Sequence, residues 1–408
     1  VLDAETLLLE YSLGAERSFV WAVTPTSLAS YELPKREMIE AAAREVYELM
    51  TARNKKTKEP ETDEQKRARI AAADRAYPAA AARLSQMLLA PVAQHLGKKR
   101  LAIVADGALH YLPFGALPDP TVKATAAATA QSRQPLLVEH EVVNLPSAST
   151  LAVLRRELKG RAPAAKTLAV IADPVFTRTD ERFRAGAAPV AKVAAKAEPT
   201  LRELANAQVV RKLIPTASGD LDIPRLKHTR DEANALMALT SAREAMQALD
   251  FDATRALVEG GGLSQYRYVH FATHGLADSE RADLSTILLS LFDAQGRPVD
   301  GFLRAHEVYN LNLPAEMVVL SACETGLGKL YKGEGLVSLT RGFMYAGAAR
   351  VVVSLWAVSD KATAELMTKF YRKVLVEGER PAAALRAAQV EMWKTEKREA
   401  PYYWAAFT

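Results

Sequence analysis

Short, largely apolar runs alternate with helical stretches along most of this chain, and this alternation restricts the fold more than any other feature. A half-exposed strand alternates apolar and polar residues, whereas a strand buried on both faces is apolar almost throughout. Runs of the second kind lie at residues 101–105, 168–172, 266–272, 286–292, 317–322 and 351–355. Helical periodicity appears at 38–50, 230–240, 253–259, 334–346 and 362–376. Because strands that alternate with helices are joined by right-handed crossovers, the pattern predicts an α/β fold with mostly parallel sheets flanked by helices.

Two such units are expected in tandem, over residues 1–160 and 161–408, since 408 residues suffice for two or three domains. The first unit should open with a hairpin at 18–24 and 28–33, and its Ala-rich helical sequence should bend or break at Pro78. Residues 178–200 are rich in Ala, Lys and Arg without periodicity, which predicts a flexible surface insertion in the second unit.

Composition excludes several classes of protein. The 53 Lys and Arg against 48 Asp and Glu leave a charge of +5, too small to indicate a nucleic-acid partner. No apolar run approaches the roughly 18 residues that span a bilayer, and no signal peptide is visible, so no membrane partner is predicted. A single cysteine, Cys323, allows no internal disulfide and indicates a reducing, cytoplasmic location. The chain begins without Met and is expected to be a piece of a longer protein.

Reactive groups follow two of the predicted strands. The strand at 266–272 leads to His274 and Gly275, and the strand at 317–322 leads to Cys323. Ligands bind at the carboxyl ends of strands in open parallel sheets, and a nearby imidazole activates a thiol. Most lone buried cysteines are core residues and most strand-end histidines are structural, but the pair together favours catalysis. We predict Cys323 as nucleophile, His274 as its base, and the N–H groups of Gly275 and Cys323 as oxyanion donors.

Metal and nucleotide sites are weaker interpretations of the same region. His270 and His274 are spaced like a zinc-binding pair, but that motif requires Glu where Phe271 stands. We therefore expect His270 to be a packing or supporting residue. The Gly-rich stretch at 326–335 lacks the spacing of a phosphate-binding loop, because Cys323 occupies the position of its first Gly. No metal and no cofactor is predicted.

The two strand ends resemble the signature of a known family. Residues 270–275 (HFATHG) and 320–326 (LSACETG) are similar to the paired motifs of CHAT domains, caspase-like domains of the peptidase clan CD that includes separase, gingipain and metacaspases. The similarity extends to 112–114, 335–348, 351–356 and 401–407, and so covers essentially the whole chain. It implies that the first unit is a pseudo-caspase half and the second a catalytic half, with the catalytic pair at His274 and Cys323 and the oxyanion glycine at Gly275.

The resemblance implies a cysteine endopeptidase that acts on a protein substrate in bacterial signalling. Family members are often switched on by a bound partner or a linked sensor, and tetratricopeptide repeats, absent here, commonly precede the domain. Two alternatives stay open: a catalytically idle scaffold or interaction module, and a cysteine-dependent hydrolase of small molecules. A separation of about 4–7 Å between His274 and Cys323 would favour the enzyme, because catalytic contacts are often loose without substrate.

In related caspase-like enzymes, the residue two positions before the nucleophile lines the pocket for the side chain that precedes the scissile bond. Arginine-cutting relatives often carry Asp there, because a carboxylate pairs with a guanidinium, but this chain has the neutral Ser321. The nearest acids are Glu324 and Asp360, and Asp360 is alternatively a helix N-cap. Trp356 is either a groove wall or a core residue. We expect a pocket for a neutral residue, or for a basic one if Asp360 points inward, and we exclude strict cleavage after Asp.

Overall fold

The structure of the chain is a computed structural model. It describes residues 2–55, 57, 60–121, 134–183, 223–276, 285–321, 334–395 and 398–408, with the backbone alone for 334–338. The chain forms two compact units, Val1–Arg161 with Gly378–Thr408, and Ala162–Glu377. This division differs from the expected one at the carboxyl end, because the last 31 residues belong to the first unit.

The first unit is built on a mixed sheet of strand order β3-β2-β1-β4-β5. The strands are β1 (Thr6–Ser12), β2 (Ser18–Val23), β3 (Leu28–Leu33), β4 (Arg100–Val104) and β5 (Val142–Asn144). The predicted hairpin is confirmed, since β2 pairs with β3 in antiparallel register. Strand β4, the expected buried parallel strand, pairs in parallel with β1 on one side and β5 on the other.

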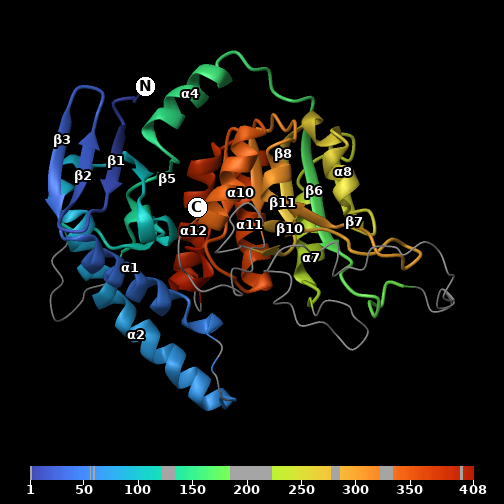
Figure 1. Cartoon of the computed structure of the whole chain (residues 1–408), viewed down its shortest axis with the longest axis horizontal. Helices are drawn as coiled ribbons and strands as arrows, with labels where there is room; N and C mark the ends of the chain where they lie inside the picture. The colour runs from blue at the N-terminus through green and yellow to red at the C-terminus, as the bar shows by residue number, and fades with distance from the viewer. Residues whose placement is uncertain are drawn as a thin grey trace. The chain divides into compact units, whose positions relative to one another are not determined.

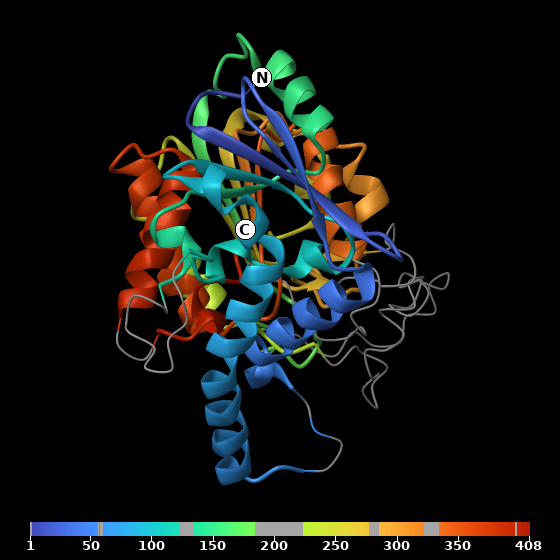
Figure 2. The same cartoon turned by 90° about the vertical axis from the view of Figure 1, so that its left-hand side faces the viewer.

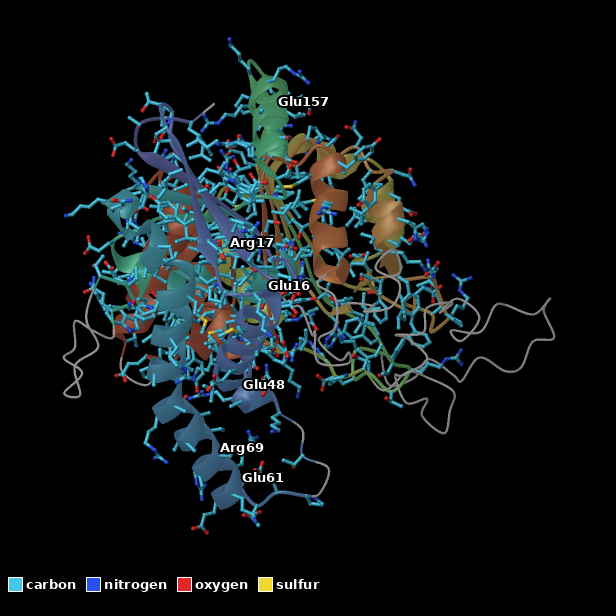
Figure 3. The ribbon with its side chains drawn as sticks, turned by 60° about the vertical axis from the view of Figure 1, so that its left-hand side comes forward. Glu16, Arg17, Glu48, Glu61, Arg69 and Glu157 are labelled. Atoms are coloured by element: carbon cyan, nitrogen blue, oxygen red, sulfur yellow. The ribbon has the colours of Figure 1, made fainter. Side chains whose placement is uncertain are left out.

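Two long helices accompany this sheet, α1 (Arg36–Met50) and α2 (Asp63–Leu88), and they lie side by side, with the first turns of α2 reaching past α1 (Figure 2). A Thr62–Gln65 capping box begins α2, and the Glu61–Arg69 ion pair at 2.8 Å lies beside it (Figure 3). Of the two outcomes predicted at Pro78, the break is wrong, because α2 continues through this residue, and the bend stays a prediction. The preceding Tyr77 hydroxyl donates to the Ala116 carbonyl at 2.7 Å, a tertiary contact that helps to hold this part of the helix.

Helix α12 (Pro381–Lys394) explains why the carboxyl-terminal residues group with the first unit. Arg386 of this helix donates hydrogen bonds to the carbonyls of Leu137, at 2.6 Å, and Val138. Beyond the helix, the Tyr402 hydroxyl donates to Asn54 at 3.0 Å. The remaining helices of the first unit are α3 (Ala93–Leu96), α4 (Ala148–Leu158) and the short η1 (Ala52–Asn54), η2 (Ala90–Val92), η3 (Gly107–Tyr111), η4 (Phe114–Ala116), η6 (Leu136–Val138) and η10 (Pro401–Tyr403).

The second unit contains a fully parallel sheet of strand order β13-β12-β8-β6-β7. Its strands are β6 (Lys166–Pro174), β7 (Ala245–Asp250), β8 (Tyr266–Ala272), β12 (Met317–Leu320) and β13 (Val351–Val353). A smaller antiparallel sheet holds β9 (Gly275–Leu276), β10 (Thr286–Leu288) and β11 (Phe302–Arg304). The strand expected at 286–292 therefore ends early. Strand β7 was not expected, because polar residues interrupt its sequence, AMQALD.

Figure 1 draws helices alongside the parallel sheet, and the ring contacts of two neighbouring β8 residues show that helices cover both of its faces. Residues of a strand alternate between faces. His270 contacts Tyr371 on α11 (Asp360–Leu375), whereas the neighbouring Phe271 lies 5.8 Å from Phe343 on α10 (Glu334–Tyr345). The predicted α/β fold with a parallel sheet flanked by helices is confirmed. The other helices of this unit are α7 (His228–Met237), which packs on α11, α8 (Arg255–Glu259), α9 (Ala305–Val308) and η7 (Gly262–Gln265).

Most of the predicted insertion at 178–200 lies outside the described residues. Its first part is described and ordered, since Arg182 is held by three carboxylates and Phe183 packs on Phe251. Within the part of the chain that the structure describes, no helix has both the length and the apolar character needed to cross a membrane.

The packing of β8 on α10 predicts the cost of a core substitution. Phe343 is 0% exposed, so Phe343→Ala should lower the free energy of unfolding by about 3–5 kcal/mol, because it removes a ring and leaves a cavity against Phe271. Val376→Ala, at a side chain 64% exposed, should change it by less than about 0.5 kcal/mol. Denaturant unfolding of the two variants checks this, and equal effects would contradict the layered packing described above.

Candidate active site

His274 lies two residues beyond the end of β8, and its ring is almost fully enclosed, at 2% exposure. Its Nε2 atom is 2.7 Å from the carbonyl oxygen of Pro224, and its ring packs on Phe176 with a centroid distance of 5.2 Å. A carbonyl can only accept, so Nε2 carries the proton and donates it. When Nε2 carries the only ring proton, Nδ1 has a lone pair. This tautomer can accept a proton from a nucleophile at Nδ1.

The backbone around His274 is fixed by the small sheet. The Thr273 hydroxyl donates to the Leu288 carbonyl at 2.6 Å, and the Leu288 N–H donates to the His274 carbonyl at 2.9 Å. Gly275, the predicted oxyanion donor, is buried and pairs with Ile287 of β10. Residues 273–275 are therefore held from one side by β10.

The end of β12 lies at the same edge of the sheet. In the parallel register, Leu320 pairs with Phe271, and the Ser321 N–H donates to the Phe271 carbonyl at 2.8 Å. Ser321, predicted to line the specificity pocket, is buried at this point. Cys323 and Glu324, the predicted nucleophile and its neighbouring acid, lie outside the described residues.

A pocket opens at this edge and brings several of the predicted residues together. Its described lining consists of residues from α7, α11, the loops that follow three strands, and the segment before α7: Leu226, Thr229, Glu232, His274, Ser321, Ser354, Ala357, Val358, Asp360 and Thr363. Asp360 is the first residue of α11 and Ser359 is the N-cap, so the alternative that Asp360 caps the helix is wrong by one residue. Trp356 is 1% exposed and packed in the interior, and the adjoining Ala357 lines the pocket.

Glu232 of α7 forms a buried network on the wall of this pocket. Its Oε1 atom accepts hydrogen bonds from the Ser321 hydroxyl at 2.5 Å and from His270 Nε2 at 2.8 Å. The other ring nitrogen of His270 lies 3.2 Å from the Tyr371 hydroxyl. Burial, with the Glu232 charge, raises the pKa of Tyr371 well above its ordinary value, so this hydroxyl stays protonated. His270 is thus a supporting residue, held from two helices.

Sequence reasoning did not identify Glu232, although a signal was present. The buried residues of α7 are Thr229, Glu232, Ala233 and Leu236, which form one stripe with helical spacing. A carboxylate on the buried stripe of an amphipathic helix requires a partner, because burial of an unpaired charge is costly. The stripe identifies an enclosed acid but does not say which strand it faces.

Three arginines and two aspartates form an ion-pair cluster at the ends of β6 and β7. Asp173 and Asp250 adopt left-handed φ values of 47° and 53°, a conformation that Asp tolerates better than most residues. Arg225 holds the fully buried Asp173 through two hydrogen bonds of 2.7 and 2.9 Å. Arg230 bonds to both aspartates, and Arg182 lies within 3.2 Å of Asp173 and 2.9 Å of Asp250.

This cluster contributes to the position of His274. Arg225 follows Pro224 directly, so the bidentate contact with Asp173 fixes the backbone whose carbonyl accepts from His274. Burial by itself would lower the pKa of Arg182. Its hydrogen bonds to Asp180 and Asp250 outweigh this effect, so the pKa lies above its ordinary value. In the described residues, no group of three or more His, Cys, Asp or Glu side chains has the arrangement of a metal site.

Comparison with known proteins gives three results. A family model described as the CHAT domain matches residues 78–408. Tetratricopeptide repeat protein 28 of Homo sapiens and of Mus musculus are each 35% identical to this chain, over 105 and 106 residues, which is 26% of this chain and 4% of each relative. The chain thus matches only a small part of these curated relatives. The structure of the Saccharomyces cerevisiae separase–securin complex matches with a TM-score of 0.54 at 9% identity, over 99% of this chain and 30% of that one, and shows the fold alone.

The ion-pair cluster generates a prediction about stability. Asp173→Asn should lower the free energy of unfolding by about 3 kcal/mol, because it leaves Arg225 and Arg230 without the buried charge that they share. Asp231→Asn makes the same chemical change at an exposed ion pair with His228, and should cost less than about 1 kcal/mol. Urea unfolding compares the two. A loss at Asp173 no larger than that at Asp231 would show that the cluster does not hold the segment in place.

Proposed function

Because this chain belongs to the CHAT domain family, we propose that it is a cysteine endopeptidase in which Cys323 is the nucleophile and His274 its base. The observation that carries the proposal is the fixed tautomer of His274, a residue that lines the pocket and whose Nε2 donates to the Pro224 carbonyl. The fold likeness to separase supports a protease-related domain but does not by itself establish a reaction.

The strand register supports the pairing of these two residues. Leu320 lies beside Phe271, and Cys323 and His274 each follow three residues later in the chain. Chain connectivity keeps the Cα of Cys323 within about 7 Å of the Cα of Ser321, which itself lines the pocket with His274. A thiol in this region of the chain would therefore lie within reach of the imidazole.

The proposed reaction has two halves. Nδ1 of His274 accepts the thiol proton of Cys323, and the sulfur attacks the peptide carbonyl carbon to form a tetrahedral oxyanion, which the N–H groups of Gly275 and Cys323 stabilise. His274 then donates its proton to the leaving amine as the C–N bond breaks, which leaves a thioester. Water, deprotonated by His274, hydrolyses the thioester and restores the thiol.

We also propose that another protein or region controls the activity of this domain. The fold neighbour is separase in complex with securin, and the curated relatives are named for tetratricopeptide repeats. We therefore propose a protein substrate and an activating partner or repeat region outside residues 1–408. The 2% exposure of His274 favours a second candidate, a resting or idle interaction module, because an enclosed base does not meet substrate until the site opens.

Alkylation of Cys323 tests the proposed pair directly, because this is the single cysteine of the chain. At pH 7 a free thiol is only a few per cent ionised, so His274→Ala should slow the reaction of Cys323 with iodoacetamide at least tenfold. His228→Ala, at an exposed histidine, should leave the rate unchanged. A wild-type rate equal to that of free cysteine, with no effect of His274→Ala, would favour the idle module.

Cleavage provides the second test of the proposal. Cys323→Ala should remove cleavage of a peptide pool, because no other thiol can form the thioester. Mass spectrometry measures this cleavage with and without candidate activators. The melting temperature of the variant should stay within a degree or two of wild type. Unchanged cleavage by this variant would exclude Cys323 as the nucleophile.

A further inference from the structure

We propose that Glu232 determines substrate specificity, and that its pocket takes the lysine or arginine side chain of the residue that precedes the scissile bond. This inference rests on the proposed function. It assigns an acidic partner to a basic substrate side chain. The sequence has no acid two residues before Cys323, because Ser321 stands there.

The position of the pocket connects it to the reacting centre. His274 and Ser321 both line it, so a side chain that enters it is attached to backbone beside the proposed nucleophile and base. Leu226, Val358 and Ala357 provide apolar walls, which suit the methylene stem of a long basic side chain.

The charge of the pocket favours a cation. Its described lining includes two carboxylates, Glu232 and Asp360, and neither lysine nor arginine. Glu232 is 1% exposed, so its charge is poorly screened and acts more strongly than a surface charge would. Asp360, in the first turn of α11, adds negative potential on the same lining. An acidic substrate side chain would meet two like charges here.

Glu232 is held in place with one oxygen uncommitted. Both of its hydrogen bonds, from Ser321 and His270, are made to Oε1. Among the described residues, no hydrogen bond or ion pair reaches Oε2. A buried carboxylate oxygen without a partner is costly, so an incoming ammonium or guanidinium gains a charge-assisted hydrogen bond to a group that is already oriented. Ser321 thus serves the pocket by orienting a carboxylate that comes from α7.

The experiment uses the full chain and reagents that alkylate Cys323 after recognition of a peptide. Peptidyl chloromethyl ketones would differ only in the last residue, as arginine, its neutral isostere citrulline, lysine or its neutral analogue acetyl-lysine. The wild-type protein should be labelled roughly 10- to 100-fold faster by each basic reagent than by its neutral partner, the range expected of a hydrogen bond between charged groups.

Variants assign this ratio to Glu232. Glu232→Gln keeps the acceptor oxygen for Ser321 and His270 but removes the charge, so the ratio should fall to within about threefold of one while labelling by the neutral reagents is retained. Asp360→Asn should lower the ratio by a smaller factor, because Asp360 is less buried than Glu232. Asp231→Asn, an exposed acid on the same helix, should leave the ratio unchanged, since its charge is screened.

Each outcome separates this inference from the proposed function. If iodoacetamide shows a His274-activated Cys323 but the wild-type ratio is near one, or if Glu232→Gln retains the wild-type ratio, the specificity assignment is overturned and the peptidase proposal stands. Equal loss of labelling by all four peptide reagents in Glu232→Gln would assign Glu232 a structural role alone, and would also overturn it. If iodoacetamide shows no activation of Cys323, the proposed function fails and the inference fails with it.

Discussion

The parallel register between β8 and β12 is the constraint on which the site depends. Because side chains alternate along a strand, the pairing of Val319 with His270 places Ser321 on the same face of the sheet as His270. That face is covered by α7, so both side chains reach Glu232. A slip of one residue would turn Ser321 to the opposite face, under α10, and would remove both the network and the pocket wall.

The charge of Glu232 connects packing with function. Enclosure of a carboxylate is tolerated when hydrogen bonds compensate for the lost water, and here the compensation comes from strands β8 and β12. Both of these hydrogen bonds are made to Oε1 of Glu232. Tyr371 completes the network from α11, because its hydroxyl lies 3.2 Å from His270, so two helices and two strands contribute to one buried group. Exchange of this acid for an apolar residue would remove the buried network and leave Asp360 as the carboxylate of the described lining.

A second ionic structure serves a different purpose at the same edge. Asp173 and Asp250 end neighbouring strands in left-handed conformations, and the arginines that bind them fix the segment before α7. His274 depends on that segment for its hydrogen bond to Pro224. The family match shows that the chain belongs to the CHAT domain family, and the likeness to the separase structure, at 9% identity, shows the fold alone. Fold likeness does not determine chemistry, which depends on the tautomer of His274, the charges of the pocket and the register of β8 and β12.

The sequence by itself predicted the parallel sheet of the second unit, the hairpin of the first unit and the placement of His274 and Ser321 at strand ends, because apolar periodicity and strand termini are local properties of the chain. It erred where tertiary contacts override local preference: α2 passes through Pro78, and β7 forms although polar residues interrupt it. Only the tertiary structure decided the charge of the pocket. The periodicity of α7 marks Glu232 as buried, but no local pattern states which strand face a helix will cover. That choice follows from long-range packing, which brings Glu232 to Ser321 across 89 residues of chain.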